Sequence, residues 1–168
     1  MSTPYGASGA KVYISAAVTS EPADAAAYAA LSWTEIGDVD SLGDFGDEAS
    51  ILTATTLQDE RTFKAKGPRD AGTMVITCLD RPDDAGQIAL VAAEATKYNY
   101  PFKVVLPNRL TTGGTDEIEY LIGLVSSKRL NVGDASNIVK RVFNVAVNSK
   151  ITPVAATYND TVTVTVRY

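Results

Sequence analysis

Residues 61–107 constrain the fold most, because their patterns predict strand, turn, strand, helix and strand in that order. The apolar run Thr73–Leu79 is typical of a buried strand. Asp84 then stands three residues before Gln87, a spacing that predicts a helix N-cap, and Tyr100–Pro101 ends the helix. The apolar face on which we expect this helix to pack consists of Ile88, Ala89, Val91, Ala92, Ala95 and Tyr98. The sequence therefore predicts a mainly β protein into which one helix is inserted.

The rest of the chain consists of short extended segments separated by turns rich in glycine, proline and aspartate. We expect further strands at residues 11–18, 33–39, 51–57, 61–66, 102–106, 118–125, 138–147 and 161–166. We expect loops or turns at residues 40–50, 58–60, 66–72 and 108–116. The alanine-rich segment 21–30 fits either a helical turn or a loop. Because no repeat or linker interrupts the pattern, residues 1–168 are expected to form a single domain, with a mobile N-terminal arm at residues 1–9.

The chain contains no histidine, which removes every catalytic arrangement that needs an imidazole base. Its one cysteine, Cys78, lies inside an apolar strand and is expected to be a buried small apolar residue. A calcium loop would begin with Asp38 and Asp40, but Leu42 and Ala49 occupy positions where that loop needs oxygen ligands. We therefore expect no catalytic, cofactor-binding or metal site, and we do not expect an enzyme.

The apolar runs are far shorter than the roughly 20 residues that a bilayer crossing needs. The first residues lack the basic and apolar regions of a signal peptide. We therefore expect no membrane association and expect synthesis in a cytoplasm.

Charge is unevenly distributed along the chain, whose formal net charge is −5. Residues 1–60 hold ten acidic residues and one basic residue, which gives −9, and the remaining residues hold the balance of +4. Either this asymmetry orients copies of the chain toward one another, or the two parts interleave in space and the field averages out. The basic pairs Lys128–Arg129 and Lys140–Arg141 lack accompanying base-stacking aromatic residues, so they fit solvated strand ends or salt bridges between subunits better than a nucleic-acid site.

A set of weak motifs in a fixed order carries a resemblance to a known family. The matching residues are Trp33 and Ile36–Val39, then Phe63–Lys64, Lys66–Gly67, Asp70 and Gly72, then Asp84 and Gly86–Gln87, then Tyr100–Lys103, and finally Gly123, Val125–Ser127 and residues 137–149. In this order they resemble the major tail tube proteins of long-tailed, siphovirus-like bacteriophages. The alanine-rich segment 23–30 has no counterpart among the family elements.

The resemblance implies a two-sheet β-sandwich or partial barrel with one helix packed on its outside. Subunits of this family form hexameric rings in which one sheet from each joins a continuous barrel around a channel, and the rings stack head to tail into the tail tube. By position, ring-to-ring contacts fall on residues 2–9, on the long loop and flanking strands at 40–66, and on the last strand. The candidate contact residues are Asp44, Asp47, Glu48, Lys64, Lys66 and Arg69.

The implied function is a structural virion protein that conducts DNA during ejection, made in the cytoplasm of a bacterial host. An acidic lumen would repel phosphates, and the candidate lumen residues are Glu117 and Glu119. The implied partners are further copies of the chain, a tape measure protein, and tail terminator and distal tail proteins. We also expect the loop at 40–66 to be mobile in the monomer and to become ordered on polymerisation.

Two other classes stay open at this point. A secretion-system tube protein of the Hcp-like kind forms similar rings. A secreted ligand-binding β-sandwich, such as a carbohydrate-binding or adhesin module, would also lack catalytic residues, but it should carry an aromatic platform and an export signal.

Overall fold

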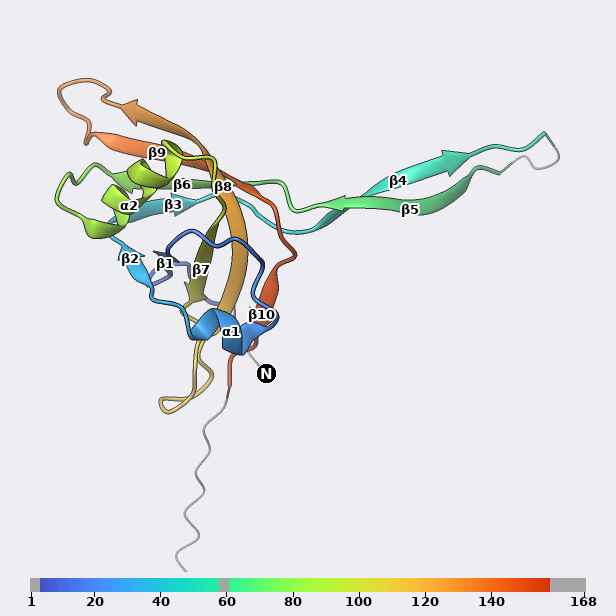
Figure 1. The fold of residues 1–168 in the computed structure, drawn as a ribbon, viewed down its shortest axis with the longest axis horizontal. Coiled ribbons are helices and arrows are strands. Elements are labelled where there is room, and N and C mark those ends of the chain that lie inside the picture. Colours follow the sequence, from blue (N-terminus) through green and yellow to red (C-terminus); the bar gives the residue numbers. More distant parts are fainter. Residues whose placement is uncertain (1–3, 58–60, 158–168) are drawn as a thin grey trace, which may run out of the picture.

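The computed structural model describes residues 4–57 and 61–157 and shows a strand-rich body from which a long two-stranded arm projects (Figure 1). The strands are β1 (Lys11–Ile14), β2 (Thr34–Ile36), β3 (Val39–Leu42), β4 (Glu48–Ala54), β5 (Phe63–Asp70), β6 (Thr73–Leu79), β7 (Tyr100–Leu106), β8 (Glu117–Asn131), β9 (Lys140–Val147) and β10 (Thr152–Val154). The helices are α1 (Ala25–Ala29) and α2 (Ala85–Glu94).

The body is one antiparallel sheet, in the order β2-β1-β7-β8-β9-β6-β3, that folds into two layers at β8. The first layer contains β2, β1, β7 and the part of β8 at 117–123, with β10 beside residues 118–120. The second layer contains β3, β6, β9 and the part of β8 at 123–131. A bulge between Val125 and Ser127 lies close to the point where β8 passes from one layer to the other.

The core lies between these two layers. The first layer contributes Val12, Ile14, Phe102, Val104 and Leu121. The second layer contributes Met74, Ile76, Cys78, Phe143 and Val145. Helix α2 adds Leu90 and Ala93 and packs against β1, β2 and β8, so it closes one side of the sandwich. The expected two-sheet sandwich or partial barrel with a helix on its outside is confirmed, and Cys78 is buried as predicted.

The N-cap of α2 was predicted correctly, but the packing face was predicted only in part. Asp84 accepts a hydrogen bond from the backbone N–H of Gln87 at 2.8 Å, as the spacing indicates. The buried helix residues are Gly86, Gln87, Leu90 and Ala93, whereas Ile88 is 54% exposed and Tyr98, beyond the helix end, is 66% exposed. Ala89 and Val91 of the predicted stripe do pack against the core, but the centre of the buried face lies at Leu90 and Ala93. The face also includes Gly86 and Gln87, which an apolar pattern does not count.

Two segments expected as loops or turns are extended. Residues 40–50 contain most of β3 and the start of β4, because the backbone of β3 pairs with β6 despite its polar side chains. Residues 66–72 are mostly β5, which pairs with β4 through Asp70, and the chain runs on past Gly72, with φ +72°, into β6 without reversing. Sequence propensity is overridden here by pairing between strands. The turn expected at 58–60 and the strand expected at 161–166 lie outside the described residues.

The alanine-rich segment forms α1, a second helix that the sequence left undecided. Asp24 caps it by accepting from the backbone N–H of Ala27 at 2.8 Å. Tyr28 of α1 is fully buried and stacks on Tyr120 of β8, with ring centroids 5.1 Å apart, and Trp33 lies against the same ring at 5.8 Å. Helix α1 therefore anchors an aromatic cluster on the face of the first layer that points away from the core.

Charges from the two parts of the chain interleave in space. Asp38 pairs with Arg81 at 2.9 Å, Asp40 with Lys140 at 2.8 Å, and Asp47 with Arg69 at 3.8 Å. Of the basic pairs, three members bond within the chain, as Lys128–Glu94 at 3.8 Å, Arg141–Asp80 at 2.9 Å and Lys140–Asp40. The second interpretation of the charge asymmetry, in which the parts interleave, is the one that the structure shows.

Candidate assembly surfaces

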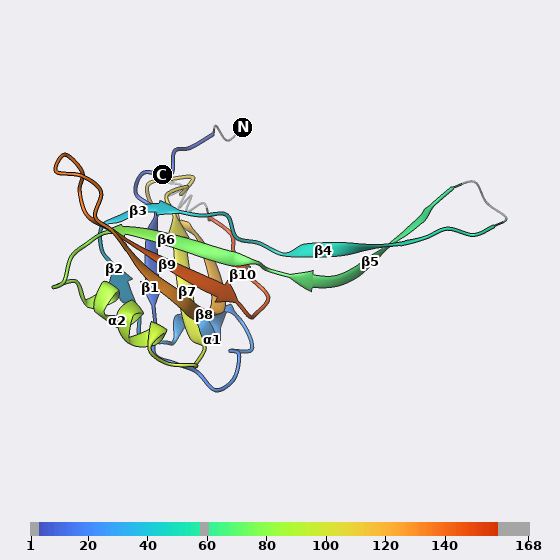
Figure 2. The same cartoon turned by 90° about the horizontal axis from the view of Figure 1, so that it is seen from above.

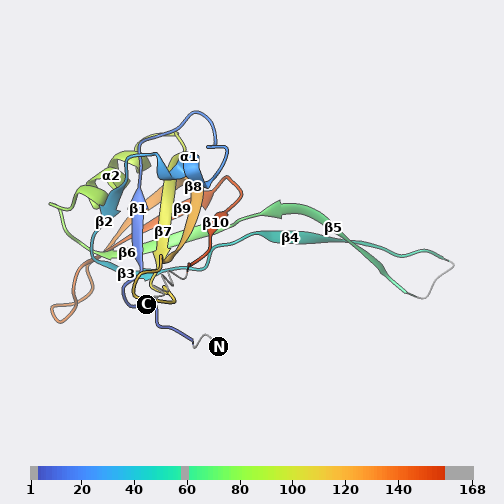
Figure 3. The same ribbon diagram turned by 90° about the horizontal axis from the view of Figure 1, so that it is seen from below.

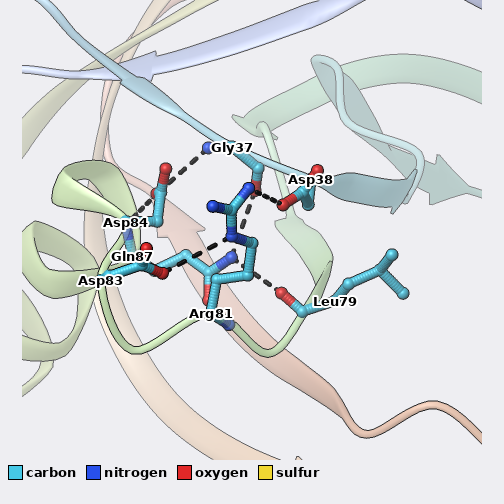
Figure 4. Close-up of polar contacts among 7 residues, drawn as sticks. All are labelled: Gly37, Asp38, Leu79, Arg81, Asp83, Asp84 and Gln87. Carbon is cyan, nitrogen blue, oxygen red and sulfur yellow. Dashed lines mark hydrogen bonds and ion pairs between the residues drawn. The ribbon is translucent and has the colours of Figure 1, made fainter.

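A cluster of hydrogen bonds and ion pairs, which we call the latch, holds α2 against the corner where the chain passes from β2 to β3 (Figure 4). It consists of Gly37, Asp38, Leu79, Arg81, Asp83, Asp84 and Gln87. The carboxylate of Asp84 accepts from the backbone N–H of Gly37 at 3.1 Å as well as from the helix N-terminus. Arg81 donates to Asp38 at 2.9 Å and lies 3.5 Å from Asp83. A side chain at position 37 would collide with the Asp84 carboxylate, so glycine is required for this approach.

Gln87 is the buried centre of the latch, with 2% of its surface exposed. Its amide nitrogen donates to the backbone oxygens of Leu79 at 2.8 Å and of Gly37 at 3.2 Å. Its amide oxygen accepts from the backbone N–H of Arg81 at 3.1 Å. Because these contacts join the helix both to the end of β6 and to the corner between β2 and β3, the helix is held at the side of the sandwich and away from the outer face of the second layer.

The second layer has an unpaired edge at each end. Strand β3 pairs with β6 on one side, and no described strand pairs with its other side. In the described chain, β8 beyond Gly123 pairs only with β9, so its backbone is also free on one side. The four strands are antiparallel throughout, and the two free edges therefore run in opposite directions. Exposed strand edges of this kind are sites at which further strands can add.

The β4–β5 arm extends far from the body (Figure 2). Its strand register gives it two chemically different faces. In its antiparallel register Leu52 lies opposite Ala65, and Ala54 lies opposite Phe63, so one face is apolar. On the other face Thr53 lies opposite Lys64, and Ile51 lies opposite Lys66.

The arm has no layer packed on it. Leu52 is 56% exposed, Phe63 is 55% exposed and Ile51 is 58% exposed. An isolated two-stranded hairpin is at best marginally stable in water, so an apolar face of this kind needs a partner surface. The candidate contact residues predicted from the sequence are all charged and do not include Leu52 or Phe63. The register of β4 on β5 is the signal that separates the two faces.

The six predicted ring-to-ring contact residues all lie on or beside this arm. Lys64 and Lys66 share its basic face, and neither has a hydrogen bond or ion pair within the described residues. Asp47 and Arg69 pair with each other at the arm's root, and Glu48 lies there opposite Asp70. The sixth, Asp44, is exposed in the connection between β3 and β4.

The two predicted lumen residues, Glu117 and Glu119, lie on β8 in the first layer. They share the strand face of Leu121, which points into the core. Glu117 accepts from the side chain of Asn108 at 2.6 Å. Burial, together with the nearby Glu117 carboxylate, raises the pKa of Glu119, and the buried Oε2 of Glu119 has no partner among the described residues.

The described residues bring no three carboxylate or thiol side chains together as a metal site. Neither helix in the described ranges has the length and apolar character needed to cross a membrane. Burial, with smaller effects from Asp84 and Asp38, raises the pKa of the Cys78 thiol to about 12. The surfaces that stand out are therefore unpaired strand edges and the exposed arm.

Solved structures share this fold. One is the baseplate of the anti-feeding prophage, symmetrised six-fold, with a TM-score of 0.69 and 10% identity over 92% of this chain and 98% of the other. Another is the sheath/tube terminator of the extracellular contractile injection system PVC, with a TM-score of 0.65 and 11% identity over 91% and 98%. A third is the SPP1 tail tube, with a TM-score of 0.62 and 14% identity over 89% and 78%.

No curated protein sequence matches the chain. The family model described as phage tail tube protein matches residues 19–156, which include both helices, the arm and every described strand except β1. Such a match over most of the length makes the family clear. The chain belongs to the phage tail tube protein family and is a structural component of the phage tail.

Proposed function

We propose that copies of this tail tube protein form a ring by pairing the β3 edge of one copy with the β8 edge of the next. The observation that carries this proposal is that the second layer has two unpaired edges of opposite direction. Copies related by rotation about one axis keep the same strand orientation, so β3 and β8 of neighbours meet as antiparallel strands. A closed ring then pairs every edge of this layer, which a single copy leaves open.

The ring is hexameric, by resemblance to the family, and rings stack head to tail into the tail tube. The arm projects beyond the body and provides the main contact with the next ring. Its apolar face is covered there, and Lys64 and Lys66 meet carboxylates such as Asp44 and Glu48 of another copy. The described residues 4–9 of the N-terminal segment add to the same contact, whereas the strand predicted at 161–166 lies outside the described residues. Stacking through unlike surfaces produces an open-ended filament, as a tube requires.

The tube is a conduit for DNA during ejection and works with a tape measure protein and with tail terminator and distal tail proteins. The protein is made in the bacterial host cytoplasm and becomes part of the virion tail. It acts as a structural protein without a cofactor. The arm becomes rigid only on stacking, because the hairpin lacks a covering layer in a single copy. Equal resistance of the arm to limited proteolysis in monomers and tubes would contradict this step.

The second candidate is a tube protein of an injection or secretion system. The likeness to the anti-feeding prophage and PVC structures favours it as the alternative. Both candidates use the same ring, so the identity of neighbouring genes and the presence of the chain in purified phage particles distinguish them.

Ring closure is tested with cysteine pairs in a Cys78→Ala background. Ser41→Cys on β3 is combined in turn with Ser127→Cys, Arg129→Cys or Asn131→Cys on β8, three positions of the same strand face. A disulfide forms where Cα atoms of neighbouring copies lie within about 7 Å, so one of the three registers should cross-link. Oxidised samples should give a ladder that ends at six copies, with Ser41→Cys alone as control. A failure of all three pairs in tubes seen by negative-stain microscopy would overturn the edge-to-edge contact.

A further inference from the structure

The face of the second layer that points away from the core is left uncovered. Helix α2 packs against β1, β2 and β8 from the core side, and α1 packs against β10. Strands β6 and β9 lie in front of β1 and β7 when the body is seen from above, with no helix in front of them (Figure 2). Seen from below, β1 and β7 lie on the near side instead (Figure 3). If the ring closes through β3 and β8, only this uncovered face can border the channel, since the core side is occupied.

The strand registers identify which side chains lie on this face. One row across the four strands consists of Ser41, Thr77, Val142 and Arg129. The next row includes Asn144 of β9 and Ser127 of β8. Hydroxyl, amide and small apolar groups therefore make up most of the face.

Charged groups on this face are few. Lys140 pairs with Asp40 at 2.8 Å, so these two charges offset each other. Arg129 is exposed and has no hydrogen bond or ion pair within the described residues. The side assignment of Arg129 is supported by its neighbour Lys128, which points to the opposite side of the strand and reaches Glu94 of α2 at 3.8 Å.

We propose that this uncovered face is the channel wall, that the wall is uncharged apart from the Asp40–Lys140 pair and Arg129, and that the Arg129 guanidinium contacts the phosphates of a DNA duplex in transit. The proposal rests on the ring proposed above. It differs from an acidic lumen, since Glu117 and Glu119 belong to the other layer. A neutral wall gives a duplex little to bind or to repel it, and one guanidinium per copy provides a weak contact that salt screens.

The sign of the electrostatic potential at the channel wall is tested with Val142→Cys in a Cys78→Ala background, because position 142 lies directly beside Arg129 in the register. Assembled tubes are treated with anionic and cationic methanethiosulfonate reagents of similar size, and the rates are divided by those of a small free thiol. At low salt the anionic reagent should react roughly tenfold faster, at the lower end of what charged clefts achieve, and the preference should vanish in about 1 M salt. Arg129→Gln should abolish the preference, and Lys128→Gln, on the other face, should keep it.

A preference for the cationic reagent, or none, would overturn the wall chemistry, and complete protection of the thiol introduced by Val142→Cys in tubes would overturn the wall assignment. Ile88→Cys on the exposed face of α2 is the control for the outside and should react equally in monomers and tubes. A chain that makes no tubes by microscopy refutes the proposed ring instead, so the two failures are distinguishable.

The phosphate contact is tested by sedimenting tubes with a fluorescent DNA duplex of about 10 base pairs, one helical turn. Wild-type tubes should retain the duplex at low salt and release it as salt rises. Arg129→Gln tubes should retain it several-fold less, and Lys128→Gln tubes should match wild type. Equal retention by Arg129→Gln tubes would refute the assignment.

Discussion

Replacing Phe63 by serine should weaken tube assembly without destabilising the monomer. Phe63 lies on the apolar face of the arm and is 55% exposed, so the substitution removes little buried surface from a single copy. Covering the exposed half of a phenylalanine removes about 110 Å² of apolar surface from water. At about 25 cal/mol per Å² this stabilises each contact by about 2.8 kcal/mol.

That free energy corresponds to a factor of about 100 in the association constant. The critical concentration for tube formation, measured by sedimentation and negative-stain microscopy, should rise by this factor in Phe63→Ser. The melting temperature of the monomer should stay unchanged, because the arm already exposes this ring.

The matched comparison is Leu52→Ser with Ile51→Ser, since these adjacent residues are 56% and 58% exposed but lie on opposite faces of the arm. Leu52→Ser should raise the critical concentration several-fold, and Ile51→Ser should change it less. If both act equally, or if Phe63→Ser assembles like wild type, the apolar face is not the stacking contact.

Three further predictions concern the body. Burial raises the pKa of Glu119, so its ionisation opposes folding, and the stability of the protein falls as pH rises through the folded pKa. Glu119→Gln should therefore raise the melting temperature at pH 7 and have little effect at pH 4. A loss of stability of this variant at pH 7 would contradict the reasoning. A Cβ at Gly86 would collide with the backbone oxygen of Glu35. Gly86→Ala should therefore lower the free energy of unfolding, measured by chemical denaturation, by about 1–3 kcal/mol. Ala92→Ser on the exposed helix face is the control and should change this free energy by no more than about 0.5 kcal/mol. Cys78 is fully buried with a pKa of about 12, so a thiol reagent at pH 8 should modify it only at the rate of unfolding; fast labelling of the native protein would show that the core opens locally.

Local sequence patterns were sufficient to predict the structure wherever a segment's conformation depends on its own residues alone. The strand Thr73–Leu79 has the predicted bounds, and the cap between Asp84 and Gln87 follows from their spacing. Both depend on short-range chemistry, namely an apolar run and a carboxylate beside free N–H groups. The order of strands around α2 could be predicted from the sequence for the same reason.

The structural features that could not be predicted from the sequence depend on pairing between strands and segments that lie far apart in the chain. β3 is polar and becomes a strand only because β6 lies beside it, and β5 keeps Gly67 and Pro68 because β4 supplies its partner. The buried face of α2 includes Gln87, whose three hydrogen bonds go to segments that no local pattern connects. The candidate contact residues were placed on the arm by resemblance, but the separation of the apolar face, with Leu52 and Phe63, from the face of Lys64 and Lys66 required the register.

The arm also has a mechanical consequence. Its two strands leave the body as direct continuations of the neighbouring strands β3 and β6, as Figure 2 shows. A pull on the arm from a stacked ring is therefore transmitted along those strands and loads the hydrogen bonds between β6 and β9 together, in shear, rather than one at a time by peeling. A tail that bends or stretches would in this way spread tension into the ring wall, where the ladder between strands is best able to resist it.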